Sequence, residues 1–235
     1  MDFVSGRRDI VYDAKLFEIM HKVKAVIFDL DGTITDSIGT ILKCTHKTFA
    51  EEGLPQPEDS AIMSTIGMEL SEGITRLLPE EHKRRGKEVT AHYREIFINT
   101  PEFVVDHFFS GVEGLMRNLK LCGFKIGFAS GRSRTGMLRT IDGSFLCDYC
   151  DALASGNEVP SKPNPQMMYK VCERLRIEPQ ATIGAGDASL DILMFKNAHA
   201  YALGVQTGVW SGEALKTLNP DAMLPHIGML SNYLS

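Results

Sequence analysis

Two carboxylates stand close together early in the chain, in the run Phe28-Asp-Leu-Asp-Gly-Thr33, directly after an apolar stretch. Side chains two residues apart in an extended strand point the same way, so Asp29 and Asp31 face one side. The carboxyl ends of parallel strands are where α/β sheets bind ligands, and Gly32 lets the backbone turn sharply away. A plain turn is the competing interpretation, since Asp and Gly often follow a strand for that reason alone. The order of the residues favours a site that uses both carboxylates.

A second acidic pair lies near the other end of the chain, in the run Gly184-Ala-Gly-Asp-Ala-Ser-Leu-Asp191. Asp187 ends an apolar run, and Asp191 lies one helical turn further along on the same face. An N-cap at Asp187 with a solvated Asp191 would explain the pair without any function. In company with the first motif, the pair is better interpreted as part of the same acidic site.

Two further segments carry groups suited to anions. Ser130, Gly131 and Arg132 follow another apolar run and lead into a helical pattern, where a hydroxyl and backbone N–H groups form an anion site. Lys162 stands between prolines just before a further helical pattern. Because proline stiffens the backbone, this ammonium group is presented from a rigid segment, as a charge-neutralising role requires. A helix-capping serine and a solvent-facing lysine are the ordinary alternatives.

All of these residues follow short apolar runs that alternate with amphipathic helical patterns. Near-continuous apolar runs are typical of strands covered on both faces. We predict strands at Val23–Leu30, Phe124–Ser130, Ala181–Ala185 and Ala200–Val205, and helices at Val112–Leu121, Arg134–Ile141, Gln166–Leu175 and Leu190–Asn197. The alternation predicts an α/β fold with a Rossmann-like, doubly wound and mainly parallel sheet.

The interval from about Ser37 to Phe109 breaks this alternation. It contains no convincing strand, only helical patterns separated by prolines, at Ile38–Glu51, Glu69–Leu77 and Glu80–Ile98. We therefore predict an all-helical cap domain at 37–109, inserted into a core formed by 23–36 and 110–235. Residues 1–22 are predicted to be an N-terminal arm with a short helix at Asp13–His21.

The composition restricts the partners and the location. The chain has 235 residues, 43% of them hydrophobic, and a formal net charge of −5, which allows a sizeable core and gives no reason to expect a nucleic-acid partner. No apolar stretch approaches the ~18–20 residues of a membrane span, and Arg7, Arg8 and Asp9 stand where a signal peptide needs its apolar core. The five cysteines are mostly scattered, and the Cys147-Asp-Tyr-Cys150 spacing has no second pair beside it. Reduced thiols in a cytoplasmic protein are therefore expected.

The four chemistry-bearing segments, in this order, resemble the haloacid dehalogenase superfamily of phosphohydrolases, and the resemblance spans the chain from Lys22 onward. The pattern is most similar to phosphoglycolate phosphatases and β-phosphoglucomutases with a helical cap. The resemblance implies that Asp29 is the nucleophile that attacks phosphorus. It also implies that Asp31 protonates the leaving oxygen and later activates water. The substrate it implies is a small phosphorylated metabolite.

The resemblance also assigns the groups that bind phosphate. Ser130 and the backbone of Gly131 would bind the transferring phosphoryl group, and Lys162 would bridge that group and the nucleophile. Thr33 would help to hold the turn. This chain reads Ser-Gly-Arg where relatives commonly have a Thr-Asn-Lys type of sequence, so Arg132 either adds a phosphate contact or faces solvent.

The cofactor that the resemblance implies is Mg²⁺. Asp29, Asp187 and the main-chain carbonyl of Asp31 would ligate it, and Asp191 would act mostly through a metal-bound water. Simple electrostatics agrees with this assignment. A carboxylate and a phosphate dianion at ~4 Å repel by roughly 8 kcal/mol at an effective dielectric of about 20, so attack of Asp29 on phosphorus needs cations nearby. Oxygen-only ligands suit Mg²⁺, and Lys162 supplies the remaining positive charge.

Several related activities compete with this interpretation. Carbon–halogen cleavage in the superfamily proceeds without an acid/base at the position of Asp31, so its presence argues against that reaction. Phosphonate cleavage needs a cap lysine that forms a Schiff base, and no context singles out Lys43, Lys47, Lys83 or Lys87. Sugar phosphomutases share Asp29 and Asp31 by this resemblance, but many of them have a Glu-Asp pair where this chain reads Gly186-Asp187. This difference favours a phosphatase. A non-catalytic phosphate-binding module is the alternative from another class, and the complete set of charged groups argues against it.

Overall fold

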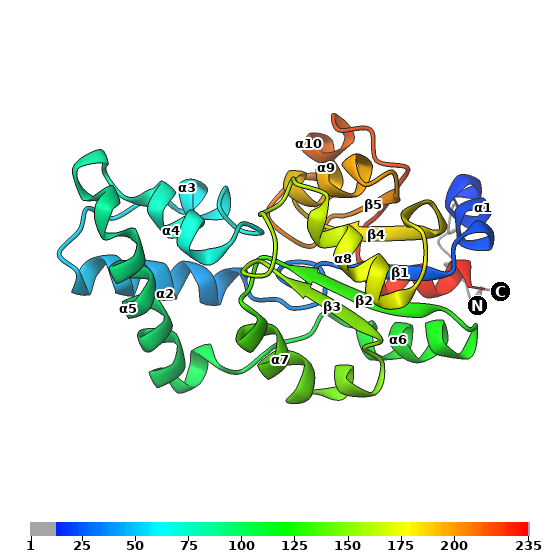
Figure 1. Ribbon diagram of the computed structural model, residues 1–235, viewed down its shortest axis with the longest axis horizontal. Coiled ribbons are helices and arrows are strands. Elements are labelled where there is room, and N and C mark those ends of the chain that lie inside the picture. Colours follow the sequence, from blue (N-terminus) through cyan, green and yellow to red (C-terminus); the bar gives the residue numbers. More distant parts are fainter. Residues whose placement is uncertain (1–12, 235) are drawn as a thin grey trace, which may run out of the picture.

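The computed structural model describes residues 13–234. At its centre lies a six-stranded, wholly parallel sheet in the order β3-β2-β1-β4-β5-β6 (Figure 1). The strands are β1 (Ala25–Phe28), β2 (Lys125–Ser130), β3 (Ala152–Ser155), β4 (Thr182–Gly186), β5 (Tyr201–Val205) and β6 (Ala222–Leu224). The strand order reverses at β1, which has β2 on one side and β4 on the other. This is the order of a doubly wound α/β sheet, and it confirms the predicted fold class.

Helices cover both faces of the sheet. One face packs against α1 (Ala14–Lys22), α6 (Val112–Leu121), α7 (Arg134–Asp142) and the 3₁₀ helix η5 (Ile227–Tyr233). The other packs against α8 (Gln166–Leu175), α9 (Ser189–Asn197) and α10 (Gly212–Lys216). Short 3₁₀ turns join them, η3 at Phe145–Asp148 and η4 at Pro179–Ala181. Along β1, Val26 and Phe28 point into one core and Ile27 into the other, which explains the unbroken apolar run.

Between β1 and β2 the chain forms a separate group of helices, called the insertion below (residues 37–109). Its elements are α2 (Ile38–Glu51), α3 (Asp59–Met63), α4 (Leu70–Leu77), η1 (Glu80–Arg85), α5 (Gly86–Asn99) and η2 (Pro101–Phe103). Buried side chains of these helices, among them Phe49, Ile74 and Val89, form a core of their own. In Figure 1 the insertion extends from one end of the sheet, and α1 and η5 lie at the opposite end.

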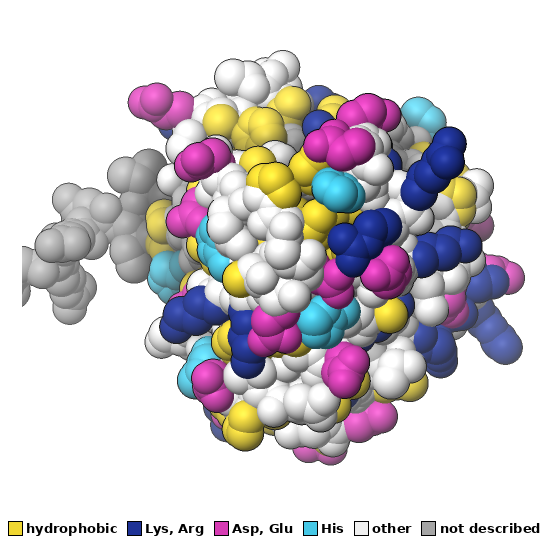
Figure 2. Space-filling model, turned by 90° about the vertical axis from the view of Figure 1, so that its left-hand side faces the viewer, with side chains coloured by type: hydrophobic (Ala, Val, Ile, Leu, Met, Phe, Trp, Pro, Cys, Tyr) yellow, Lys and Arg dark blue, Asp and Glu magenta, His cyan; other side chains and the backbone are white. Residues whose placement is uncertain are grey.

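The outer surface of the insertion carries charges of both signs, which are interspersed in Figure 2. The basic run Lys83–Arg85 pairs with neighbouring acids: Lys83 with Glu80 (2.6 Å) and Arg85 with Glu88 (2.9 Å) and Glu52. This pairing matches a charged, solvated helix face. No helix in residues 13–234 is long and apolar enough to cross a membrane, and the five cysteines form no disulfide.

Most predicted elements are present within one or two residues, including the helix at Asp13–His21, which is α1; residues 1–12 of the predicted arm lie outside the described chain. Four short helices and strands were missed: β3, β6, α3 and α10. One predicted helix, Glu80–Ile98, is in fact divided into η1 and α5. Gly86 begins α5 against Thr75, and a Cβ atom there would overlap the Thr75 side chain. The close contact between two segments, rather than the local pattern, sets that boundary.

Candidate active site

Asp29 and Asp31 lie on the turn that follows β1. The Asp29 N–H donates to the Ala185 carbonyl (2.9 Å), which extends the pairing of β1 with β4 by one residue. Both carboxylates are buried, with only 2% and 9% of each residue exposed. Gly32 has φ +86°, and a Cβ atom there would overlap the Asp187 carboxylate. Glycine is therefore needed both for the turn and for the approach of the second acidic motif.

Asp187 and Asp191 come from the end of β4 and the first turn of α9. Asp187 accepts hydrogen bonds from Thr33 Oγ1 (2.8 Å) and from the Val209 N–H (3.0 Å). Asp191 Oδ2 accepts from the Ala188 N–H (3.1 Å), at a helix N-terminus, where a carboxylate is favoured. Asp191 is 1% exposed, so the interpretation of a solvated helix residue is wrong.

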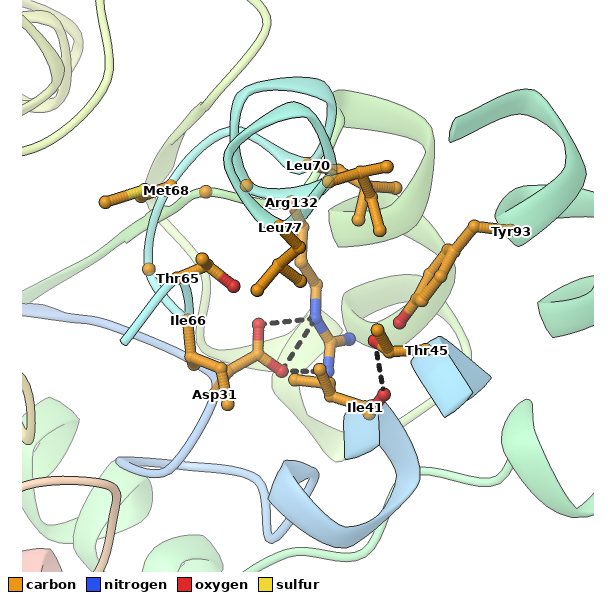
Figure 3. A pocket seen from close by; sticks show the side chains of 14 residues that line it. Asp31, Ile41, Thr45, Thr65, Ile66, Met68, Leu70, Leu77, Tyr93 and Arg132 are labelled. Atoms are coloured by element: carbon orange, nitrogen blue, oxygen red, sulfur yellow. Dashed lines mark hydrogen bonds and ion pairs between the residues drawn. The ribbon is translucent and has the colours of Figure 1, made fainter. Parts of the chain in front are cut away.

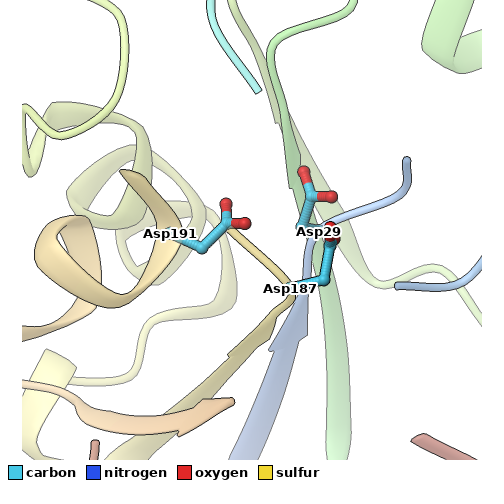
Figure 4. A group of neighbouring side chains, drawn as sticks. All are labelled: Asp29, Asp187 and Asp191. Carbon is cyan, nitrogen blue, oxygen red and sulfur yellow. The ribbon is translucent and has the colours of Figure 1, made fainter. Parts of the chain in front are cut away.

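The two acidic motifs meet at Lys162 in a single buried cluster. Oxygen atoms of Asp29, Asp187 and Asp191 lie within 4.8 Å of one another, at the ends of β1 and β4 and the start of α9 (Figure 4). Lys162 Nζ lies 2.6 Å from Asp29 Oδ1 and 2.6 Å from Asp191 Oδ1. Residues up to 162 positions apart in the sequence thus share one site, as the sequence predicts.

Burial and mutual repulsion govern the charges of this cluster. Burial raises the pKa of Asp29 well above its ordinary value; Lys162 opposes this, and Asp191 and Asp187 add to it. Burial and the Asp191 charge together raise the pKa of Asp187 to about 7. Lys162 stays protonated, because the two carboxylates that it contacts raise its pKa despite its burial. One ammonium group does not neutralise three carboxylates, and an oxygen-only, buried donor set of this kind fits a hard divalent cation.

The Asp31 carboxylate binds Arg132, as Figure 3 shows. Arg132 Nε lies 3.1 and 3.0 Å from the two carboxylate oxygens, and Nη2 lies 2.6 Å from Oδ1. Ser37 Oγ donates a further hydrogen bond to Oδ1 (2.5 Å). Burial acts to raise the pKa of Asp31, but the Arg132 charge and these hydrogen bonds outweigh it, so the pKa is lowered. Arg132 therefore does not face solvent, and the predicted alternative of a solvent-facing side chain is wrong.

Arg132 is itself held by residues that the sequence did not indicate. Its Nη1 donates to Thr140 Oγ1 (2.6 Å) and to Asp106 Oδ1 (3.3 Å), and Thr140 donates to Asp106 Oδ2 (2.8 Å). Arg132 and Asp31 are 101 positions apart in the sequence. Neither Asp106, Thr140 nor Ser37 belongs to a recognisable local pattern, so only the folded chain reveals this network.

A loop of the insertion rests on both predicted phosphate-binding segments. Ser130 ends β2 and is fully buried, and a Cβ atom on Gly131 would overlap the main-chain carbonyl of Met68. The Glu69 N–H donates to Ser161 Oγ (3.0 Å), next to Lys162. The insertion is therefore in direct contact with the site.

Asp31 also faces a small chamber beneath the insertion, with a volume of about 80 Å³. Its walls include insertion side chains that Figure 3 labels: Ile41, Thr45, Ile66, Met68, Leu70 and Tyr93. Gly131 and Arg132 close it on the sheet side. The carboxylate thus stands between a guanidinium group and a mainly apolar space.

Comparison with known proteins agrees with this geometry. The model of the family described as haloacid dehalogenase-like hydrolase matches residues 26–205. The chain belongs to this family. Among the relatives of this haloacid dehalogenase-like (HAD-like) hydrolase is the phosphoglycolate phosphatase of Yersinia pseudotuberculosis serotype I. It is 25% identical over 212 residues, which cover 88% of this chain and 91% of the relative.

Solved structures of the family share the fold. The β-phosphoglucomutase of Clostridium difficile superposes with a TM-score of 0.72 at 25% identity, covering 88% of this chain and 93% of the other. A phosphonoacetaldehyde hydrolase-like protein of Oleispira antarctica gives 0.76 at 16% identity, covering 90% and 92%. At that lower identity, the similarity concerns the fold alone.

Proposed function

We propose that this HAD-like hydrolase is a Mg²⁺-dependent phosphatase of small-molecule phosphate monoesters that works through an aspartyl-phosphate on Asp29. The observation that carries the proposal is the buried cluster of Asp29, Asp187 and Asp191 around Lys162 Nζ. The names of relatives, phosphoglycolate phosphatase among them, point to the same chemistry.

The first half of the reaction uses both carboxylates of the first motif. Asp29 attacks phosphorus and forms the aspartyl-phosphate bond while the bond to the leaving oxygen breaks. Asp31 gives its proton to that oxygen, so that a neutral alcohol departs. Ser130 and the Gly131 N–H would bind phosphoryl oxygens, and Lys162 would provide a positive charge beside the nucleophile.

The second half regenerates the enzyme. Asp31, now ionised, takes a proton from water, and the water oxygen attacks phosphorus as the bond to Asp29 breaks. Inorganic phosphate departs, and both carboxylates return to their starting state. The Arg132 ion pair favours the ionised form of Asp31, which is the form that this step needs and the opposite of the protonated form that the first step needs.

Mg²⁺ would be held by Asp29, Asp187 and the main-chain carbonyl of Asp31, with Asp191 acting through a water. Bound there, it would offset the repulsion between Asp29 and the phosphate. The buried, oxygen-only donor set supports this choice of ion. The insertion (residues 37–109) acts as a cap on a core of residues 23–36 and 110–235: its contacts at Gly131 and Ser161 let it exclude bulk water while the ester is bound.

The decisive test compares wild type with Asp29→Asn in hydrolysis of p-nitrophenyl phosphate, with Mg²⁺ and with EDTA. We expect turnover only with Mg²⁺, and a loss of at least about 10³-fold in Asp29→Asn. Asp142→Asn is the matched control, because Asp142 is exposed at the end of α7. Wild-type turnover in Asp29→Asn, or equal turnover with EDTA, would contradict the proposal.

A sugar phosphomutase is the second candidate, because the β-phosphoglucomutase structure is similar at 25% identity. A mutase returns the phosphoryl group to a sugar phosphate, whereas a phosphatase gives it to water. Interconversion of glucose 1-phosphate and glucose 6-phosphate that outpaces phosphate release would favour the mutase.

A further inference from the structure

A second cavity, much larger than the chamber beneath the insertion, also reaches Asp31. Its volume is about 690 Å³, and it lies between insertion helices α2 and α5 and core helix α7. It shares Asp31, Arg132 and Tyr93 with the small chamber. Asp31 therefore borders a cavity of the size that holds a whole drug-sized ligand, about 300–1,000 Å³.

One wall of this cavity is aromatic. Phe97 stacks on Tyr93 with 6.3 Å between ring centroids and 17° between ring planes, and it also meets Phe103 at 6.4 Å. Ile98 and Val105 line the same cavity, although 67% and 54% of each is exposed. Apolar side chains left open to water around a stacked aromatic wall favour a flat, largely apolar ligand.

Within the described residues, an arginine with an unpartnered nitrogen lies directly beside this aromatic wall and also lines the cavity. The Arg139 guanidinium lies 4.7 Å from the Phe97 ring centroid, and its Nε is a buried nitrogen without a hydrogen-bond partner within residues 13–234. Arg132, by contrast, is satisfied by Asp31, Asp106 and Thr140. Because Nε is enclosed by protein, the donors that a ligand in the cavity would meet are the two terminal nitrogens of Arg139, which lines the cavity. A guanidinium group at the wall favours a ligand that brings an acceptor atom.

We propose that the natural substrate is a phosphate monoester whose leaving group is a ring-bearing alcohol of nucleoside size. Its flat ring packs against the apolar wall that Phe97, Ile98 and Val105 form, and an acceptor atom of the ring or its substituents binds Arg139. This inference rests on the proposed phosphatase function and narrows it. The two-carbon leaving group of phosphoglycolate would leave most of the cavity to water.

The wild-type enzyme itself gives the first test. With Mg²⁺ present, kcat/KM is measured for uridine and adenosine 5′-monophosphates and for phosphoglycolate. We expect the nucleotides to exceed phosphoglycolate by about tenfold or more, the discrimination that apolar pocket contacts typically give. A ratio of nucleotide to phosphoglycolate kcat/KM at or below one would overturn the inference. This test requires no variant that might fail to fold.

Two variants locate the effect. Phe97→Leu keeps apolar bulk but removes the flat face, and Arg139→Met removes the donor. Each should lower the ratio of nucleotide to phosphoglycolate kcat/KM by about tenfold. Arg117→Met, on the exposed side of α6, should leave that ratio unchanged. An unaltered ratio in both cavity variants, with unfolding temperatures showing that they are folded, would contradict the assignment.

Binding of free uridine and adenosine, measured by calorimetry, separates this inference from the proposed function. Binding to wild type that weakens in Phe97→Leu supports the ring site independently of turnover. If p-nitrophenyl phosphate hydrolysis passes the Asp29→Asn test but neither nucleoside binds, the inference fails and the phosphatase stands. If no ester is hydrolysed by wild type, the phosphatase itself fails.

Discussion

Lys162 offers the sharpest test of how the site is held together. Its ammonium group is buried and lies 2.6 Å from one oxygen each of Asp29 and Asp191. Lys162→Met keeps the length and apolar character of the stem and removes only the charge. The variant therefore leaves three neighbouring carboxylates without the cation that the folded chain supplies.

The expected cost follows from these distances. At 2.6 Å and an effective dielectric of about 20, each Lys–Asp pair is worth roughly 6 kcal/mol in gross Coulomb energy. Desolvation of the ammonium group offsets part of this, and removal of one partner of a buried pair typically costs about 3–5 kcal/mol. In the variant, Asp29 can take up a proton, because burial favours its neutral form. This proton uptake limits the loss of unfolding free energy. We therefore expect the free energy of unfolding to fall by about 3–5 kcal/mol at pH 7.

The assay is urea unfolding of the wild type and two variants, each with EDTA and with excess Mg²⁺. Lys170→Met is the matched control, since Lys170 is on the surface and pairs with Glu173 (2.9 Å); its cost should stay below about 1 kcal/mol. Mg²⁺ should stabilise Lys162→Met more than wild type, because the metal then supplies the missing charge. The kcat of Lys162→Met should fall by about 10²–10³-fold, as for other losses of a fixed charge at a reacting group.

Two results would refute this reasoning. Unfolding of Lys162→Met with EDTA at the wild-type free energy would mean that the carboxylates do not depend on the ammonium group. Equal stabilisation of both proteins by Mg²⁺ would mean that the metal and Lys162 do not act on the same charges.

Three further predictions concern the surroundings of the site. The Glu158 pKa is lowered to about 2 because hydrogen bonds, from Arg174 first and then from Ser155, outweigh its burial. A lowered pKa stabilises the fold at pH values above the unfolded pKa of 4.5, and this stabilisation is lost as the pH falls toward about 2. Glu158→Gln should therefore lower the unfolding free energy by about 2–3 kcal/mol at pH 7 and by less at pH 3.5, as measured by urea titration. Arg132→Lys, which keeps the charge but not the two-point contact with Asp31, should lower kcat for p-nitrophenyl phosphate about tenfold with little change in KM; unchanged kcat would remove Arg132 from the positioning of the acid/base. Gly131→Ala should lower kcat/KM about tenfold or more and speed hydrogen exchange in residues 65–70, because the new methyl group displaces that loop; unaltered exchange would show that the loop does not depend on this contact.

The sequence predicts the strands that are long enough to show a pattern. β2 and β4 appear as apolar runs because helices cover both faces of the sheet. β3 and β6 span only Ala152–Ser155 and Ala222–Leu224, too few residues for a periodic signal. Similarly, α3 covers a single turn or so, at Asp59–Met63.

The acidic cluster was predictable for a related reason. Each carboxylate follows a buried strand, or the turn after it, and parallel strands end at one edge, so residues far apart in sequence must converge there. The partners of Asp31 obey no such rule. Arg132 and Ser37 reach it through side-chain directions and a helix packing that no local pattern records. The large cavity beside α7 likewise depends on how the insertion sits on the core.

The charge of the cluster connects these observations. With Asp29, Asp187 and Asp191 ionised and Lys162 protonated, three negative charges face one positive charge, a net charge of −2. Burial makes that imbalance costly, and it raises the pKa of Asp187 to about 7 as a consequence. A divalent cation removes the imbalance, but an arriving phosphate dianion restores it. In the proposed mechanism, Asp29 therefore attacks phosphorus efficiently only when Lys162 and the metal are both in place. Removal of the metal should then abolish turnover, and removal of Lys162 should lower kcat by the predicted ~10²–10³-fold and also weaken the fold.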